Sequence, residues 1–381
     1  MNFDLTEEQT LFRKTVRDFA AQEIAPYVEE LDKTGEFPYE IQEKMADLGL
    51  FGLPVPEEWG GSDADFVSYA LAVEEVSRVS ASLGITMAAH TSLGALPVLN
   101  HGTEEQKQKW LIPLAKGEML GAFGLTEPDA GSDAGATKTT ADLQGGNWVI
   151  NGTKCFITNS GTEISKIVII TAVTGETGGR KEISNIVVEH GTPGFTVSPP
   201  YRKMGWHTSD THELSFNDCR VPRDHLLGQR GMGFQAFLKA LDCGRIGVAA
   251  LSVGLAQACL DESVKYAKQR VQFGVPIGKN QAVSFRISDM LVEVELSRLA
   301  TLKAAFMADE GRPYGREASI AKLFASETAM RAANAAVQIH GGYGYMEDYP
   351  VCRYFRDAKI LEIGEGTSEV QRIVLSRSLG L

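Results

Sequence analysis

The sequence predicts a mainly α-helical protein with a central β domain: a helical domain over residues 1–120, a β-barrel over residues 121–225 and a four-helix bundle over residues 226–381. Apolar residues recur every three or four positions in the first and last thirds of the chain, which is the period of an amphipathic helix. Between them, short β-branched runs alternate with glycine-rich turns, a pattern typical of strands. A chain of 381 residues is also long enough for two or three domains.

The helices of the first third have recognisable starts. Thr6 and Gln9 form a capping box, and the apolar face that follows includes Val16 and ends at Pro26. A second capping box begins at Thr103. Further helices of this third are expected at residues 38–48, 66–89 and 103–116.

The middle third holds the strand signals. Three of its β-branched runs lie at residues 148–150, 167–173 and 186–188, and glycine-rich segments separate them. After Pro222 the helical period returns, and several long helices in series predict an antiparallel bundle.

Composition narrows the functional classes. The net charge is −12, from 37 basic and 49 acidic residues, which argues against nucleic acid as a partner. No uninterrupted apolar run reaches the ~18 residues of a membrane helix, so we expect no transmembrane span. The five cysteines have no CxxC spacing, which indicates reduced thiols and no metal site. Because the start shows no targeting signal, we expect a cytoplasmic protein of a bacterium or, second, one of an organelle matrix after processing.

A carboxylate near the end of the chain is the first candidate for catalysis. Glu365 lies between Gly364 and Gly366, where the backbone can turn tightly and approach a ligand, and Thr367 can start a last helix. We interpret Glu365 as a catalytic base. The alternative, from these residues alone, is an ordinary loop glutamate before a helix N-terminus, where negative charge is favourable.

Five segments occur in one order along the chain: residues 123–133, 156–159, 270–274 and 338–342, and the stretch around Glu365, residues 362–372. Together they resemble the acyl-CoA dehydrogenase family of flavoproteins over the whole chain. The resemblance implies an FAD site without the GxGxxG turn of a dinucleotide-binding fold. The residues it implies for FAD are Phe123, Leu125, Thr126, Ser132, Phe156, Thr158, Arg270, Gln272, Phe273, Gln281, Gln338, Ile339, Gly341, Gly342, Thr367 and Glu369.

Several of these assignments have a physical basis. The hydroxyl of Thr126 and nearby backbone N–H groups could donate to an electron-poor ring, and Thr158 could do so near flavin N5. Phe156 would form an aromatic wall, although a phenylalanine in a strand is more often an ordinary core residue. The planar guanidinium of Arg270 suits a diphosphate, and the resemblance implies that this arginine contributes to the flavin site of a neighbouring subunit. His340 is given no proton-transfer role.

The same resemblance implies the substrate site and the reaction. Glu365 would remove the α-proton of an acyl-CoA thioester while the β-carbon gives hydride to flavin N5, and the product would be trans-2-enoyl-CoA. Some subfamilies place the base at the position of Gly244, which has no side chain here, so Glu365 remains the candidate base. The residues implied for the substrate are Ser132, Phe234, Asp242, Arg245 and Gly366.

Partners and alternatives complete the prediction. The family implies electron transfer flavoprotein as acceptor and a homotetramer built as a dimer of dimers, acting in fatty acid β-oxidation. We expect a short straight-chain substrate. Short branched chains, such as isobutyryl-, 2-methylbutyryl- or isovaleryl-CoA, are the alternative, because Gly364 replaces the tyrosine of many straight-chain members. Oxidases of this fold usually have longer chains, nitroalkane-oxidase-like relatives have aspartate as base, and a catalytically silent flavin-binding or partner-binding homologue would lose Glu365.

Overall fold

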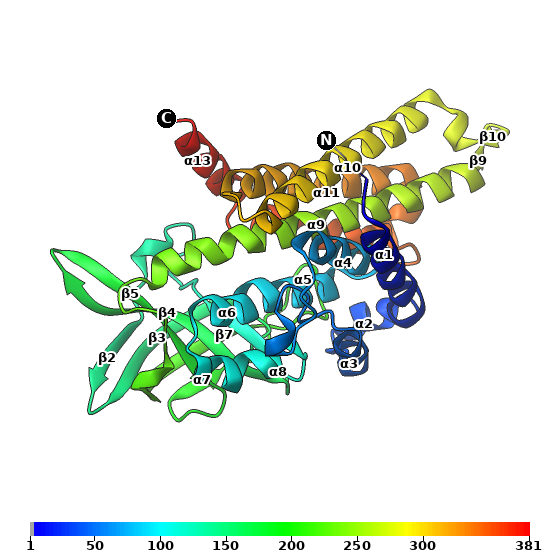
Figure 1. Cartoon of the computed structure of the whole chain (residues 1–381). Helices are drawn as coiled ribbons and strands as arrows, with labels where there is room; N and C mark the ends of the chain where they lie inside the picture. The colour runs from blue at the N-terminus through cyan, green and yellow to red at the C-terminus, as the bar shows by residue number, and fades with distance from the viewer. Residues whose placement is uncertain (1–3) are drawn as a thin grey trace.

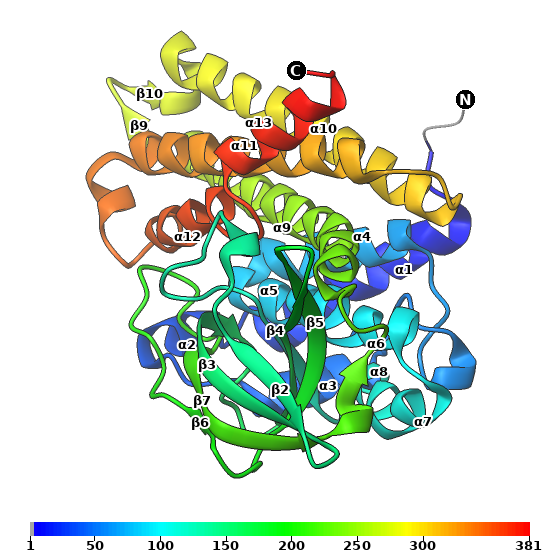
Figure 2. The same ribbon diagram turned by 90° about the vertical axis from the view of Figure 1, so that its left-hand side faces the viewer.

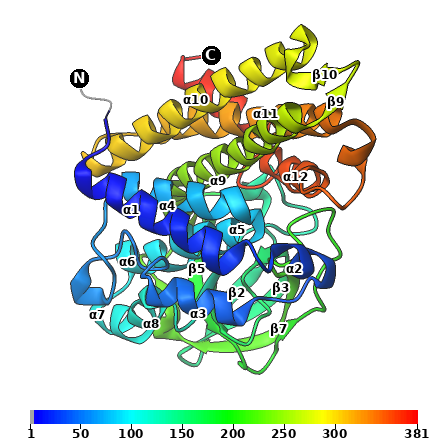
Figure 3. The same ribbon diagram turned by 90° about the vertical axis from the view of Figure 1, so that its right-hand side faces the viewer.

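The computed structural model describes residues 4–381 and confirms a mainly helical fold with a central β part (Figure 1). Views from two further sides show the helices of the first third between the β part and the long C-terminal helices (Figures 2 and 3). The first described residues and the C-terminus both lie on the side of the long helices.

The first third is helical, as predicted. Its helices are α1 (Glu7–Phe19), α2 (Val28–Thr34), α3 (Tyr39–Asp47), α4 (Phe66–Val79), α5 (Ala81–Ala89), α6 (Leu96–His101), α7 (Glu104–Gln106) and α8 (Ile112–Ala115). The capping box of α1 is confirmed, since Gln9 N donates to Thr6 Oγ1 at 3.1 Å. The single helix expected at 66–89 is two helices, because Ser80 has an extended backbone and its hydroxyl caps α5. Helix α2 was not predicted, because its 7 residues are too few to show a period.

The middle third forms a sheet that folds over on itself. Its strands are β1 (Leu120–Gly124), β2 (Thr140–Gln144), β3 (Asn147–Thr158), β4 (Ser165–Thr177), β5 (Arg180–Glu189), β6 (Phe195–Val197), β7 (Thr211–Pro222) and β8 (Leu226–Leu227). The sheet runs in the order β6-β7-β3-β2-β4-β5-β8, and β1 pairs with β4 in parallel. No ladder joins β6 to β8 among the described residues, so the expected barrel is open along that edge. The three predicted β-branched runs lie in β3, β4 and β5. Buried side chains of these strands share one core with those of β6 and β7.

The last third is the predicted bundle. Its elements are α9 (Gly233–Gln269), β9 (Val271–Gln272), β10 (Val275–Pro276), α10 (Gln281–Asp309), α11 (Gly315–His340), α12 (Val351–Ala358) and α13 (Ser368–Ser378). Helix α9 is central, because it contacts α10, α11 and α12 as well as α4 and α5. With 37 residues at about 1.5 Å each it is about 55 Å long. The hairpin of β9 and β10 lies at one end of the bundle and α13 lies toward the other (Figure 1).

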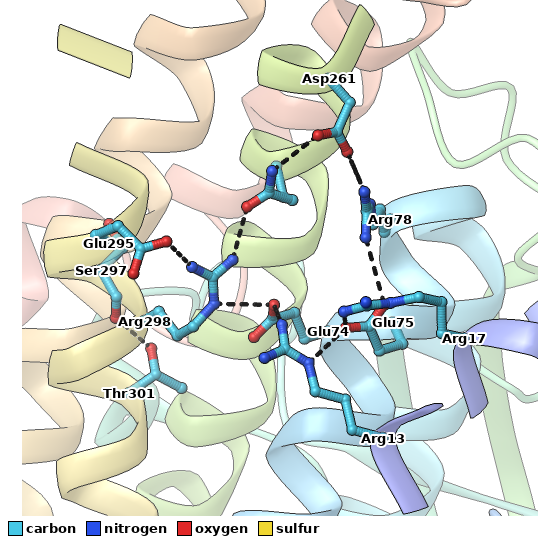
Figure 4. A network of polar contacts seen from close by, with 11 residues as sticks. Arg13, Arg17, Glu74, Glu75, Arg78, Asp261, Glu295, Ser297, Arg298 and Thr301 are labelled. Atoms are coloured by element: carbon cyan, nitrogen blue, oxygen red, sulfur yellow. Dashed lines mark hydrogen bonds and ion pairs between the residues drawn. The ribbon is translucent and has the colours of Figure 1, made fainter. Parts of the chain in front are cut away.

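A charged network joins the first helices to the bundle (Figure 4). Arg13 of α1 donates to Glu74 and Glu75 of α4, each at 2.6 Å, and Glu74 also accepts from Arg298 of α10 at 3.0 Å. Both glutamates are buried, so each carboxylate depends on these arginines for compensation. The network therefore fixes α4 between α1 and the long helices.

Two helical stretches are long and apolar enough to cross a membrane by length and composition alone. They are Ala81–His101 and Gly233–Gln269, and 89% and 94% of their most apolar windows are buried inside the protein. An interior helix meets the same criteria, so these stretches are weak support for a membrane span. The prediction of no span rested on the absence of a long uninterrupted apolar run. Small and polar residues interrupt the apolar sequence in both stretches.

The cysteines behave as predicted. All five are free, and all except Cys352 are buried. Burial raises the pKa of Cys243 and Cys259, so these thiols are poor nucleophiles. Within residues 4–381, no group of three histidine, cysteine, aspartate or glutamate side chains could hold a metal ion.

Candidate active site

Glu365 lies in a strained turn just before α13. Its φ is +52°, in the left-handed region that a residue with a side chain seldom adopts. Gly366 follows with φ +92°, and a Cβ there would lie 2.7 Å from Gln371 Nε2. Gly364 does not have a positive φ, and a Cβ there would make only an ordinary contact. Of the two glycines beside Glu365, the turn therefore requires only Gly366.

The Glu365 carboxylate points into the protein against α9. A Cβ on Gly244 would overlap Glu365 Oε2, so the absence of a side chain at Gly244 makes room for the carboxylate. The residue as a whole is partly buried, but its Oε2 atom is shielded from solvent and accepts no hydrogen bond from any described residue. Burial raises the pKa of Glu365 to about 7, against the opposing effect of the positive charges of Lys322 and Arg245. The carboxyl group therefore changes protonation near neutral pH, which suits a general base.

Two buried cations surround this carboxylate. Lys322 of α11 is 0% exposed, and its ammonium donates to Gly366 O at 2.7 Å. Burial lowers the pKa of Lys322 to about 8. Arg245 of α9 is also buried and donates through Nη1 to Asp242 at 2.6 Å, while its Nε has no partner in the described part of the chain. That free N–H leaves Arg245 able to donate to a ligand.

The first two predicted flavin segments meet at the end of β3. Cys155 N donates to Thr126 O at 2.9 Å, which holds the loop of residues 125–133 beside Phe156 and Thr158. Phe156 has φ +61° and is 66% exposed, so its interpretation as an ordinary core phenylalanine is wrong. An aromatic ring held in solvent by a strained backbone is typical of a ligand-binding position.

The other predicted residues around this loop differ in exposure. Phe123 is buried at the end of β1, where its ring packs 4.9 Å from that of Phe237. Leu125 is half-buried, and Ser132 is exposed at the far end of the loop. Phe234, predicted for the substrate, is half-buried in the first turn of α9.

A buried ion pair anchors the loop of residues 125–133. Lys154 Nζ donates to Glu127 Oε1 at 2.7 Å and to Leu125 O at 3.0 Å. Glu127 also accepts from Thr137 Oγ1 at 2.8 Å and from Lys138 N at 2.7 Å. Burial alone would raise the pKa of Glu127, but these hydrogen bonds and the charge of Lys154 bring it down to about 2. The pair therefore ties the start of the loop and the following residues 137–138 to β3.

The remaining flavin segments meet at the far end of α9. An open groove with a volume of about 520 Å³ lies there, and a Cβ on Gly341 or Gly342 would have nothing within 4 Å. The ring of His340 stacks on Tyr266 at 4.2 Å, and its Nδ1 lies 2.8 Å from Ala336 O, as in a structural histidine. The predicted residues that line the groove are Arg270, Gln272, Ile339, Gly341 and Gly342.

Some predicted residues lie outside this groove. Phe273 is 99% exposed at the hairpin after α9, and Gln281 and Gln338 are exposed near it. Thr367 caps α13 by accepting from Val370 N at 3.2 Å, and Glu369 is exposed in the first turn of that helix. Thr367 and Glu369 therefore lie at the start of α13, on a different element from the other three residues.

The groove lies far from the Glu365 carboxylate. Gly244, beside Glu365, and Arg270, in the groove, are separated by 26 positions in or just beyond α9, or about 40 Å at about 1.5 Å each. The groove and the carboxylate are therefore well apart along this helix.

Three residues near these sites were not predicted from the sequence: Lys322, Gln371 and Lys154. The only signal for Lys322 is its position on α11, four residues after Ala318 and three before Ala325, which are both fully buried. A lysine on such a face needs a partner inside the protein. The partner itself is 44 residues away in sequence and carries no local pattern.

Comparisons with protein families cover almost the whole chain. The model for the N-terminal domain of acyl-CoA dehydrogenase matches residues 6–118, that for the middle domain matches residues 122–219 and that for the C-terminal domain matches residues 231–380.

Individual proteins match over the same length. The chain is 55% identical over 380 residues to the probable acyl-CoA dehydrogenase YngJ of Bacillus subtilis, and the match covers 100% of both chains. Its structure is similar to butyryl-CoA dehydrogenase from Megasphaera elsdenii, with a TM-score of 0.96, 45% identity and coverage of 100% of both chains. A chain in a structure described as electron transferring flavoprotein of Acidaminococcus fermentans gives a TM-score of 0.96 at 48% identity, covering 100% of this chain and 99% of that one.

Proposed function

The chain belongs to the acyl-CoA dehydrogenase family and is an acyl-CoA dehydrogenase, and from this premise we propose that it converts a short-chain acyl-CoA thioester into trans-2-enoyl-CoA. The observation that carries the proposal is the Glu365 carboxylate, which is shielded from solvent against Gly244 and has its pKa raised to about 7 by burial. The short chain length is supported by the similarity to a butyryl-CoA dehydrogenase.

Glu365 takes the α-proton of the substrate in this proposal. Oε2 has no hydrogen-bond donor among the described residues, so the lone pair that accepts the proton is free. The Glu365 N–H likewise has no acceptor within the part of the chain that the structure describes. It is therefore available to donate to the thioester carbonyl and to stabilise the negative charge that develops there. Arg245, through its free Nε, would bind the remainder of the acyl-CoA with Asp242 beside it.

FAD is the proposed cofactor, and the chain has residues that fit both of its halves. The loop of residues 125–133 with Phe156 and Thr158 would hold the ring, because its hydroxyls, backbone N–H groups and exposed aromatic face suit a flavin. Arg270 and the open backbone of Gly341 suit the diphosphate and the adenosine. When bound, FAD accepts the hydride that the β-carbon of the substrate loses.

The distance of about 40 Å along α9 between the groove and Glu365 supports a homotetramer built as a dimer of dimers, in which the groove of one subunit completes the flavin site of another. Helix α10 supports the same assembly, because several of its apolar side chains are about half exposed, as is typical of a surface that another subunit buries. They are Phe285, Val292, Leu296, Leu299 and Phe306.

The variant Arg270→Ala tests this assembly. It should weaken FAD retention and dimer stability together, because a ligand that bridges two subunits links binding to association. Arg180→Ala, which removes an exposed arginine of β5, should change neither property. The measurements are the FAD content after gel filtration and the mass of the eluted particle. A monomer with full FAD occupancy would contradict the proposed assembly.

The electron acceptor and the compartment follow from the relatives. Electron transfer flavoprotein is the proposed acceptor, supported by the similar chain in the structure described as that of Acidaminococcus fermentans. Brisk turnover with oxygen and none with that protein would favour an oxidase instead. We place the enzyme in the bacterial cytoplasm, since relatives such as that of Bacillus subtilis are bacterial.

The substrate is tested with a panel of acyl-CoA compounds. The purified protein should be yellow, and its colour should bleach without oxygen on addition of butyryl-CoA, with a higher kcat/KM than for isobutyryl- or isovaleryl-CoA. A Cβ on Gly364 would make only an ordinary contact, so this position is not tightly packed and a branched substrate is the second candidate. A higher kcat/KM for the branched compounds would establish that candidate, whereas a colourless protein that cannot be reconstituted with FAD would overturn the whole proposal.

A further inference from the structure

Lys322 is a buried cation that interacts with the proposed base and that the reaction does not use. It is 0% exposed in α11, where an ammonium group loses its hydration. Its hydrogen bond is to Gly366 O at 2.7 Å, the carbonyl that directly follows Glu365. A buried lysine that donates to a backbone carbonyl beside a catalytic residue needs an explanation beyond packing.

The turn that it contacts has a positive φ at two consecutive residues, and it is strained at one of them. Gly366 adopts φ +92° at little cost, whereas Glu365 has φ +52°, a conformation that persists in a residue with a side chain only where the surroundings hold it. Gln371 Nε2 donates to Gly366 O at 3.0 Å and to Glu365 O at 3.3 Å. Lys322 and Gln371 thus hold the two carbonyl groups of the turn from two different helices.

Lys322 also supplies charge to the site. The groups that interact electrostatically with the Glu365 carboxyl are Lys322 of α11, Arg245 and Cys243 of α9 and Tyr69 of α4. Glu362 and Glu369, before and after the turn, act on Lys322 itself. Because the thiol and the phenol are uncharged at neutral pH, Lys322 and Arg245 alone compensate a charged Glu365. Arg245 is already paired with Asp242, which leaves Lys322 as the unshared cation.

We propose that Lys322 is a positioning residue for the base: its ammonium holds the strained turn that aims Glu365 and provides the positive charge that lets the carboxylate form inside the protein. The inference rests on the proposed role of Glu365. It assigns to Lys322 two separable effects, one on geometry through the hydrogen bond to Gly366 O and one on charge.

Two variants of Lys322 separate these effects in the FAD-loaded enzyme with butyryl-CoA. Lys322→Met removes the donor and the charge, and should lower kcat/KM by about a hundredfold, the effect of a misplaced reacting group. It should also move the acidic limb of the kcat/KM profile to higher pH, because a carboxylate without its cation is harder to form. Lys322→Gln keeps a donor but loses the charge. Its kcat/KM should therefore lie between those of Lys322→Met and the wild type, and its acidic limb should remain at the higher pH. Lys166→Met, an exposed lysine of β4, should leave both unchanged.

A third variant covers the case in which neither Lys322 variant folds. Gln371→Leu removes the other donor to the same carbonyl without changing charge, so it should lower kcat/KM at least tenfold and leave the acidic limb in place. A wild-type kcat/KM in this variant would contradict the proposal that the hydrogen bonds to Gly366 O hold the turn. A Lys322→Met enzyme with the wild-type pH profile and kcat/KM within twofold would overturn the whole inference. Full activity in Glu365→Gln would instead overturn the proposed function.

Discussion

The two fully buried lysines next to the candidate sites make an instructive pair. Lys154 in β3 and Lys322 in α11 are each 0% exposed, and burial lowers the pKa of each to about 8. Lys154 faces a carboxylate directly, because its ammonium lies 2.7 Å from Glu127 Oε1. Lys322 donates to a carbonyl, and its nearby carboxylate, Glu365, has an Oε2 that accepts no hydrogen bond within the described chain.

The two carboxylates respond in opposite directions. Hydrogen bonds and the charge of Lys154 outweigh burial and hold the pKa of Glu127 at about 2, whereas burial outweighs Lys322 and Arg245 and raises that of Glu365 to about 7. A closely paired carboxylate stays charged and serves as an anchor. A carboxylate that is only partly compensated can take and release a proton near neutral pH, which is what a base must do.

The largest expected effect separates the roles of the two glutamates. Glu365→Gln should lower the rate of anaerobic flavin bleaching by butyryl-CoA by at least about 10²–10⁴-fold, the usual contribution of a general base. FAD and acyl-CoA should still bind, because the amide has the shape of the carboxyl group. Stopped-flow absorbance measures the bleaching rate. Glu127→Gln should act mainly on FAD retention, and a residual rate within tenfold in Glu365→Gln would show that another residue takes the proton.

The next effect concerns the two lysines. Lys154→Met leaves Glu127 buried without its cation and should destabilise the holoenzyme by about 3–5 kcal/mol. Combining it with Glu127→Gln should recover most of that loss, because removing both partners leaves fewer unsatisfied groups. Lys322→Met should cost less than Lys154→Met, since no carboxylate is bonded to it directly. Unfolding in urea measures all three variants, and equal losses for the two lysines without recovery in the double variant would contradict the comparison.

The smallest expected effect concerns the melting temperature and its dependence on pH. Removing the charge of Glu365 should raise the melting temperature, and removing that of Glu127 should lower it. The folded pKa of Glu365, about 7, lies above the ~4.3 of an unfolded glutamate, so between these values the folded protein binds more protons and loses stability as pH rises. Glu365→Gln should therefore melt at a higher temperature than the wild type at pH 8 and show little difference near pH 4.

Glu127 should behave in the opposite way. Its folded pKa of about 2 lies below the unfolded value, so its contribution to stability is present above ~4.3 and is lost as pH falls toward 2. Glu127→Gln should melt below the wild type at pH 7, and the gap should close in acid. Scanning fluorimetry at several pH values measures both variants, and gaps of the same sign would contradict the account.

The features that local sequence predicts are those that depend on neighbouring residues. The capping box at Thr6, the β-branched runs and the two glycines that flank Glu365 are each patterns of residues within a few positions of one another. The division at Ser80 was missed because a serine within an apolar stretch does not disturb the helical period. Of the two glycines beside Glu365, the sequence could not show that only Gly366 needs a positive φ.

The buried lysines were missed for a different reason. Lys154 meets Glu127 across 27 positions and Lys322 meets Gly366 across 44, so no window of sequence contains both partners. The placement of Glu365 against Gly244 is likewise a contact between distant helices. The sequence identifies Glu365 as the candidate base and Gly244 as a position without a side chain. Only the packing of α9 against the turn shows that the carboxylate fits beside Gly244.

The most direct test is an infrared titration of the carboxyl groups in the FAD-loaded enzyme between pH 4 and 9. A carboxyl band should titrate near pH 7 in the wild type, disappear in Glu365→Gln and remain in Glu127→Gln. Burial also raises the pKa values of Asp309 and Asp357, each to about 6, so the difference between the wild type and Glu365→Gln isolates the base. A spectrum in which Glu365→Gln removes no band between pH 6 and 8 would contradict the central claim that Glu365 is held ready to change protonation at neutral pH.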